Sequence, residues 1–216
     1  MDQHGAAAAA IKFPDKKYKN ISAYCDDYFA CHEKAVAALD HEALARAAEA
    51  LGHVYGTGHV LYVCGNGGSA ATANHTVCDH LKLVQTDTAL VPRVVSLSAH
   101  AELVSAIAND IDYADAFLYQ LRTLARPGDA LMTISASGDS ENVVRAIAWA
   151  KENGVTTIAL TGFAGGRSRA MADIAIHAAA ENYAVVEDIH LSVMQMLAQY
   201  LRQSQMSEDL IRARKF

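Results

Sequence analysis

The sequence predicts an α/β protein with a single doubly wound sheet of five parallel strands and with flanking N- and C-terminal helices. Two observations lead to this prediction. Short runs rich in β-branched and other apolar residues recur along the chain, and stretches with helical patterning separate them. These runs are apolar at nearly every position, which is typical of strands buried on both faces of a parallel sheet. Repeated alternation of strand and helix favours a doubly wound, flavodoxin-like arrangement.

The elements follow in order along the chain. The expected strands span residues 60–64, 93–97, 130–135, 156–161 and 174–178. The helices expected between them span residues 69–82, 113–125, 140–153 and 167–172. The pair Asn153-Gly154 is a typical helix stop before the fourth strand.

Amphipathic helices are expected on either side of this core. One helical region runs from about residue 19 to residue 55 and is broken near Asp40, and another spans residues 185–203 with an apolar stripe. No linker or internal repeat divides the chain. We therefore expect a flexible N-terminal segment over residues 1–17, one domain over residues 18–203 and a C-terminal tail over residues 204–216.

Composition excludes several classes of function. The chain has 24 acidic and 18 basic residues, so its net charge is -6 and it has no basic stripe for nucleic-acid phosphates. The basic cluster at Arg212, Arg214 and Lys215 is interpreted as a solvated tail. The cysteine spacings match no zinc or redox motif, and the N-terminal sequence resembles neither a signal peptide nor a membrane span. We expect a cytoplasmic protein with no nucleic-acid or membrane partner.

The first strand is followed by a glycine-rich loop, Gly65-Asn66-Gly67-Gly68-Ser69. Ligands of open α/β sheets bind beyond the carboxyl ends of the strands. Glycines allow the backbone to approach a ligand closely, and Ser69 is expected to cap a helix whose amides face an anion. The pattern is neither the dinucleotide fingerprint nor the P-loop. A tight strand-to-helix turn without a ligand remains the alternative.

The third strand is followed by a serine loop, Ser135-Ala136-Ser137-Gly138-Asp139-Ser140, which also leads into a helix. The serine hydroxyls and the amides at the start of the helix are hydrogen-bond donors for an anion. Such a loop can hold a phosphate without any cationic side chain. Because the glycine-rich loop follows another strand in the same way, the two loops together predict a phosphate-binding cleft.

The chain resembles the SIS (sugar isomerase) domain and, within it, the phosphoheptose isomerase family. The resemblance lies in GNGGS at residues 65–69, His75 on the following helix, Asn109-Asp110, SASGDS at residues 135–140, LTG at residues 160–162 and EDIH at residues 187–190. These motifs stand in the family's order and spacing and cover about residues 20–203. The resemblance implies a homotetramer, a cytoplasmic location and conversion of sedoheptulose 7-phosphate to a phosphorylated aldoheptose. It also implies a divalent metal in the cleft, which is zinc in many members.

Residue by residue, the resemblance implies a phosphate site and an adjoining sugar site. The expected phosphate-site residues are Ser135, Ala136, Ser137 and Ser140. The expected sugar-site residues are Asn66, Gly67, Gly68, Ser69, Asn109 and Asp110.

The metal and proton-transfer positions depart from the family pattern. At four positions the family has His, Glu, Gln and His, whereas this chain has His75, Asp79, Glu187 and Gln195. We expect all four as metal-site positions and the last three as catalytic positions. Gln195 cannot carry a proton, and the Asp79 side chain is one methylene shorter than Glu. His190, which follows Glu187 by three residues, is a candidate for the lost nitrogen ligand.

Two readings of these departures remain open. His75 and Asp79 share a helix face at an i, i+4 spacing, which suits metal binding but also suits a plain pair across one helical turn. The leading hypothesis is a sugar-phosphate aldose–ketose isomerase, which the carboxylate at Asp79 favours. The alternative is a non-catalytic SIS protein that binds a sugar phosphate for sensing or assembly, like the DnaA-binding SIS protein. A SIS-type transcriptional regulator is disfavoured, because no DNA-binding module is seen.

Overall fold

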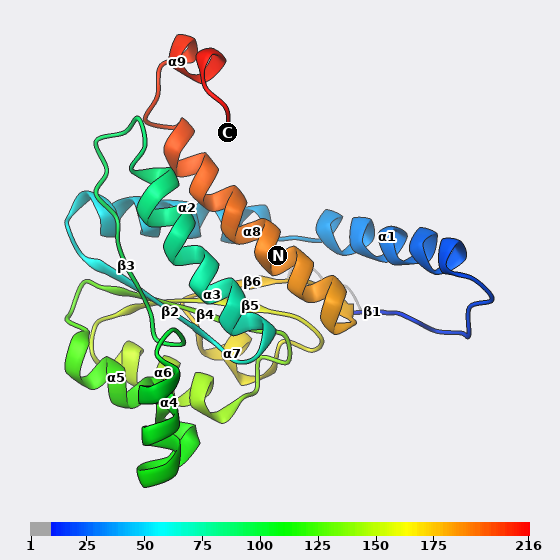
Figure 1. The fold of residues 1–216 in the computed structure, drawn as a ribbon, viewed down its shortest axis with the longest axis horizontal. Helices are drawn as coiled ribbons and strands as arrows, with labels where there is room; N and C mark the ends of the chain where they lie inside the picture. The colour runs from blue at the N-terminus through cyan, green and yellow to red at the C-terminus, as the bar shows by residue number, and fades with distance from the viewer. Residues whose placement is uncertain (1–9) are drawn as a thin grey trace, which may run out of the picture.

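A computed structural model describes residues 10–216 of the chain and places a five-stranded parallel sheet at its centre (Figure 1). The strands lie in the order β3–β2–β4–β5–β6, which is the 2-1-3-4-5 order of a flavodoxin-like sheet. Their bounds are β2 Val60–Gly65, β3 Arg93–Ser96, β4 Ala130–Ser135, β5 Thr156–Thr161 and β6 Ile174–His177. The predicted fold class is confirmed, and each strand lies within one residue of its expected bounds.

Helices cover both faces of this sheet (Figure 1). One layer contains α2 (His41–Gly56), α3 (Gly68–Cys78) and α8 (Tyr183–Gln203), and the other contains α5 (Ala116–Leu124), α6 (Glu141–Glu152) and α7 (Gly166–Met171). Alternate residues of β2 enter the two cores: Val63 packs under the first layer, whereas Tyr62 and Cys64 pack under the second. This burial on both faces is why the strand reads as a continuous apolar run.

Two helices include π-helical turns that the sequence did not predict. Helix α3 continues as the π-helical turn Asp79–Val84. After β3, helix α4 (Ala101–Ile107) continues into a second π-helical turn, Ala108–Asp112, which is followed by the 3-10 turn Tyr113–Asp115. Inserted π turns are frequent at functional sites. The second one carries Asn109 and Asp110, two of the expected sugar-site residues.

The packed part of the chain begins before residue 18, which corrects the expected boundary. Strand β1 (Ile11–Lys12) pairs in parallel with β7 (Ala180–Glu181). Phe13 is buried, and its ring centroid lies 4.9 Å from that of Tyr24 on helix α1 (Ile21–Ala37). Residues 11–13 therefore pack against the domain rather than forming part of a flexible segment, whereas residues 14–17 are exposed. The remainder of that expected segment, residues 1–9, lies outside the described residues.

The C-terminal tail is also more ordered than expected. It contains α9 (Glu208–Ala213), and Arg214 pairs with Asp87 at 3.0 Å. The same carboxylate accepts a hydrogen bond from the buried guanidinium of Arg202 at 2.9 Å. Arg214 therefore docks the tail on the loop after the first π-helical turn, a contact between residues far apart in the sequence. Among the helices of residues 10–216, none is long and apolar enough to span a bilayer.

Candidate functional site

The glycine-rich and serine loops lie side by side, because β2 and β4 are neighbours in the sheet. Gly65 at the end of β2 is in register with Ile134 near the end of β4. A Cβ on Gly65 would lie 2.7 Å from the Ser69 carbonyl oxygen and 2.8 Å from that of Ile134. Any larger residue would therefore force the two loops apart.

The glycine-rich loop lies against α8. A Cβ on Gly68 would lie 2.6 Å from Oε2 of Glu187, so the missing side chain makes room for this carboxylate. Gly67 has a φ of +54° and is the N-cap residue of α3, without a side-chain cap. The expected cap role of Ser69 is therefore wrong: Ser69 lies inside the first turn of α3 and is buried. The backbone turn at Gly67 moves the start of the helix ahead of the serine.

Backbone amides of the serine loop donate hydrogen bonds to two of its own hydroxyls. The Ser135 hydroxyl accepts a hydrogen bond from the Gly138 amide at 3.2 Å, and the Ser137 hydroxyl accepts one from the Asp139 amide at 3.3 Å. Ser140 is the N-cap residue of α6, but its hydroxyl makes no capping bond. Each hydroxyl can still donate its proton to a ligand. The first amides of α6 also have no carbonyl partner within the helix. The loop therefore offers several donors to one anion.

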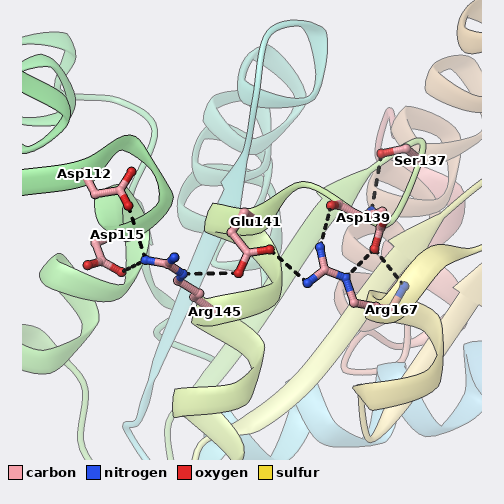
Figure 2. Close-up of polar contacts among 7 residues, drawn as sticks. All are labelled: Asp112, Asp115, Ser137, Asp139, Glu141, Arg145 and Arg167. Atoms are coloured by element: carbon pink, nitrogen blue, oxygen red, sulfur yellow. Dashed lines mark hydrogen bonds and ion pairs between the residues drawn. The ribbon is translucent and has the colours of Figure 1, made fainter.

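One carboxylate lies in the serine loop, at Asp139, and another directly follows it, at Glu141; arginines pair with both (Figure 2). Arg167, at the start of α7, binds the Asp139 carboxylate, donates to the Asp139 carbonyl at 3.1 Å and pairs with Glu141 at 2.9 Å. Arg145 pairs with Glu141 at 3.2 Å and with Asp115 at 3.0 Å. The hydrogen bond from Arg167 lowers the pKa of Asp139, and those from Arg167 and Arg145 lower the pKa of Glu141.

This network matters because uncompensated carboxylates beside the serine loop would repel a bound phosphate. Sequence reasoning missed Arg167, since only the tertiary structure brings it to Asp139 from 28 residues away. An arginine directly after the pair Gly165-Gly166 at a strand end was the one available signal.

The expected sugar-site residues divide into two groups. Asn66 lies in the glycine-rich loop and is hydrogen-bonded to Asn142 and Tyr113. Asn109 and Asp110 are exposed and hydrogen-bond to each other at 2.7 Å. Within residues 10–216, no hydrogen bond joins the side chains of Asn109 and Asp110 to the glycine-rich or the serine loop. The two groups are linked through Tyr113, which lies three residues after Asp110 and hydrogen-bonds to Asn66.

The expected metal positions only partly come together. His75 Nε2 lies 3.3 Å from Asp79 Oδ2. Glu187 lies against Gly68, and Gln195 lies further along α8 beside a hollow that Phe216 also lines. Within residues 10–216, no three His, Cys, Asp or Glu side chains are arranged to hold a metal ion. The described residues of one chain therefore do not by themselves form a complete zinc site.

His190 is not available as a replacement ligand, which corrects that expectation. It is buried in the core, and neither ring nitrogen has a hydrogen-bond partner among the described residues. Burial lowers the pKa of His190 to about 4. On α8, Val186, Ile189, His190 and Val193 all face the interior, whereas Glu187 is partly exposed. The rotation of the helix therefore separates His190 from Glu187.

The sheet order and the two anion-binding loops define the class of protein. The sequence model of the SIS domain family matches residues 23–162. A phosphoheptose isomerase of Nitratidesulfovibrio vulgaris is 36% identical over 142 residues, which is 66% of this chain and 68% of that relative. A probable phosphoheptose isomerase of Thermoplasma volcanium is 33% identical over 79% of this chain and 87% of its own length. This chain belongs to the phosphoheptose isomerase family of SIS-domain proteins.

Solved structures agree with this placement. The phosphoheptose isomerase of Neisseria gonorrhoeae superimposes with a TM-score of 0.77 at 29% identity, over 85% of this chain and 97% of that chain. The phosphoheptose isomerase of Francisella tularensis gives a TM-score of 0.78 at 28% identity, over 85% of this chain and 96% of that chain. The similarity therefore extends through nearly the whole length of both solved chains.

Proposed function

We propose that this protein is an aldose–ketose isomerase that converts sedoheptulose 7-phosphate to a phosphorylated aldoheptose. The observation that carries the proposal is the serine loop, whose three hydroxyls lie between the end of β4 and the N-terminus of α6. The loop lies beside the glycine-rich loop, against which the Glu187 carboxylate packs. When the phosphate of a sugar phosphate binds the serine loop, its sugar chain can extend to the glycine-rich loop. The family of the chain supports the choice of a phosphorylated ketose.

In this proposal Ser135, Ser137 and Ser140 bind the phosphate, together with the backbone at Ala136. Asn66 and the backbone of the glycine-rich loop bind the sugar, together with Asn109 and Asp110. The reaction removes a proton from the carbon beside the ketose carbonyl and returns it to the carbonyl carbon, while a proton also moves between the two oxygens. Asp79 and Glu187 have carboxylates that can carry these protons, and Gln195 can only hydrogen-bond.

The direct test follows purified protein with sedoheptulose 7-phosphate by NMR, with and without added zinc. We expect an aldose product with a C1 proton signal that grows over time. The divalent metal that the family resemblance implies, zinc in many members, would be held at His75, Asp79, Glu187 and Gln195, and metal analysis of the purified protein tests this separately. The absence of any aldose from sedoheptulose 7-phosphate under both conditions would contradict the proposed reaction.

The phosphate site can be tested by binding alone. Replacing Ser137 and Ser140 together by Ala removes two charge-assisted hydrogen bonds, each worth about 1.5–3 kcal/mol. We expect affinity for sedoheptulose 7-phosphate to fall by about two orders of magnitude, with an unchanged circular dichroism spectrum. Unchanged affinity by calorimetry would place the anion elsewhere. Exchange of Ser207, which caps α9 far from the loop in sequence, for Ala is the matched control.

We also propose a homotetramer in the cytoplasm. On helix α1, Ile21 is 77% exposed and Phe29 is 62% exposed. An apolar groove of about 620 Å³ lies between α2 and α8. Apolar surface of this extent favours subunit contacts. Light scattering should therefore give about four times the chain mass of 23.1 kDa. A monomer at micromolar concentration would contradict the assembly. The four free cysteines are consistent with a reducing compartment.

A further inference from the structure

The side chain of Asn66 is held by an unusually complete set of hydrogen bonds. Its Nδ2 donates to Oδ1 of Asn142 at 2.9 Å, and Nδ2 of Asn142 donates back to Oδ1 of Asn66 at 2.9 Å. The Tyr113 hydroxyl donates to the same Oδ1 of Asn66 at 2.7 Å. Asn142 is 2% exposed, whereas Tyr113 is 50% exposed.

These bonds determine what Asn66 can offer to a ligand. An amide oxygen has two acceptor sites, and an amide nitrogen has two N–H donors. Asn142 and Tyr113 occupy both acceptor sites of Asn66, and Asn142 takes one of its two N–H groups. The second N–H has no hydrogen-bond partner among residues 10–216. Asn66 therefore presents a single donor, which suits an oxygen of a sugar chain.

The partners of Asn66 come from the elements that carry the other expected ligand contacts. Asn142 lies in the first turn of α6, two residues after Ser140 in the serine loop. Tyr113 begins the 3-10 turn three residues after Asp110. The Asn66 amide thus joins the glycine-rich loop after β2, the 3-10 turn that begins at Tyr113 and the first turn of α6. Asn142 is buried, so its effect on a ligand passes through Asn66.

We propose that Asn142 is a positioning residue, with Tyr113 as its partner, and that the two orient the Asn66 amide toward an oxygen of the sugar. This inference rests on the proposed function. It separates two parts of the cleft: the serine loop binds the phosphate, and the oriented Asn66 amide binds the sugar chain. If Asn142 only stabilised the fold, its loss would weaken the binding of phosphate and of the sugar chain to the same extent.

The experiment measures affinities for sedoheptulose 7-phosphate and for inorganic phosphate by calorimetry. For Asn142→Ala we expect the affinity for sedoheptulose 7-phosphate to fall about tenfold or more, since the Asn66 amide loses its main partner. The affinity for inorganic phosphate should stay within about twofold of wild type. Tyr113→Phe should lower affinity for the sugar phosphate by a smaller factor, about threefold.

Two further variants control for folding. Asn142→Leu nearly keeps the side-chain shape, has no N–H to donate to Asn66 and adds no charge beside the serine loop, so we expect the same selective loss without a cavity. Asn153→Ala removes an asparagine at the other end of α6, whose side-chain amide donates to the Trp149 carbonyl, and it should change neither affinity. Tyr113→Phe, at an exposed position, keeps the test decisive if both Asn142 variants fail to fold.

The outcomes separate this inference from the proposed function. Unchanged affinity for sedoheptulose 7-phosphate in Asn142→Ala would overturn the inference and leave the proposed function intact. Equal losses for the sugar phosphate and inorganic phosphate would make Asn142 structural and also overturn it. If wild-type protein binds a panel of ketose and aldose phosphates no more tightly than inorganic phosphate, then both the inference and the proposed function fail.

Discussion

Asp79→Asn is expected to reduce turnover of sedoheptulose 7-phosphate by about 10²–10⁴-fold, which is the usual contribution of general acid–base catalysis. Asn has nearly the shape of Asp but cannot take a proton from carbon. The Asp79 side chain is 20% exposed and lies 3.3 Å from His75, so its amide counterpart can stay in place. Binding of the substrate, measured by calorimetry, should therefore change little while kcat falls.

Gln195→His and Asp209→Asn complete this experiment. Gln195→His restores a side chain that can carry a proton and should leave kcat unchanged or raise it. Asp209→Asn alters an exposed carboxylate on α9 and should have no effect. If Asp79→Asn keeps full activity, Asp79 is not the base and Glu187 takes that role. If wild type and Asp79→Asn are equally inert toward a panel of ketose phosphates while both bind these ligands, the isomerase proposal fails and a sensing or assembly role replaces it.

Acidification from pH 6.5 to pH 4 is expected to destabilise the fold by several kcal/mol. His80 and His190 are buried, and burial lowers the pKa of each to about 4 from an ordinary value of 6.5. Between these pH values the unfolded chain binds protons that the folded chain cannot. The stability that depends on the neutral imidazoles is therefore complete above pH 6.5 and is lost as the pH falls toward 4. Each histidine accounts for up to about 3 kcal/mol.

Urea unfolding at pH 7, 5.5 and 4.5 measures this effect. His190→Leu removes one of the two buried imidazoles. Neither ring nitrogen of His190 has a hydrogen-bond partner among the described residues, so this variant should not weaken the fold at pH 7. The free energy of unfolding of this variant should fall less steeply with acid than that of wild type. His100→Leu changes an exposed histidine and should keep the wild-type slope. Equal slopes in all three proteins would contradict the assignment.

The sequence alone determined the strands and the two loops of the candidate site. Strands β2, β4 and β5 are buried on both faces, so nearly every residue in them is apolar. Their bounds could therefore be predicted from the sequence within one residue. The serine loop directly follows β4, and its residue types alone indicate an anion. The juxtaposition of the two loops also followed, since carboxyl ends of parallel strands share one edge of the sheet.

Only the tertiary structure decided which side chains meet around these loops. Asn142 pairs with Asn66 across 76 residues, and Arg167 reaches Asp139 across 28 residues. His190 lies in the core because of the rotation of α8, which a three-residue spacing from Glu187 does not reveal. Local patterns record which residues are buried, but side-chain partners depend on the path of the whole chain. That path brings the loop after β2, the 3-10 turn at Tyr113 and the first turn of α6 together at the Asn66 amide.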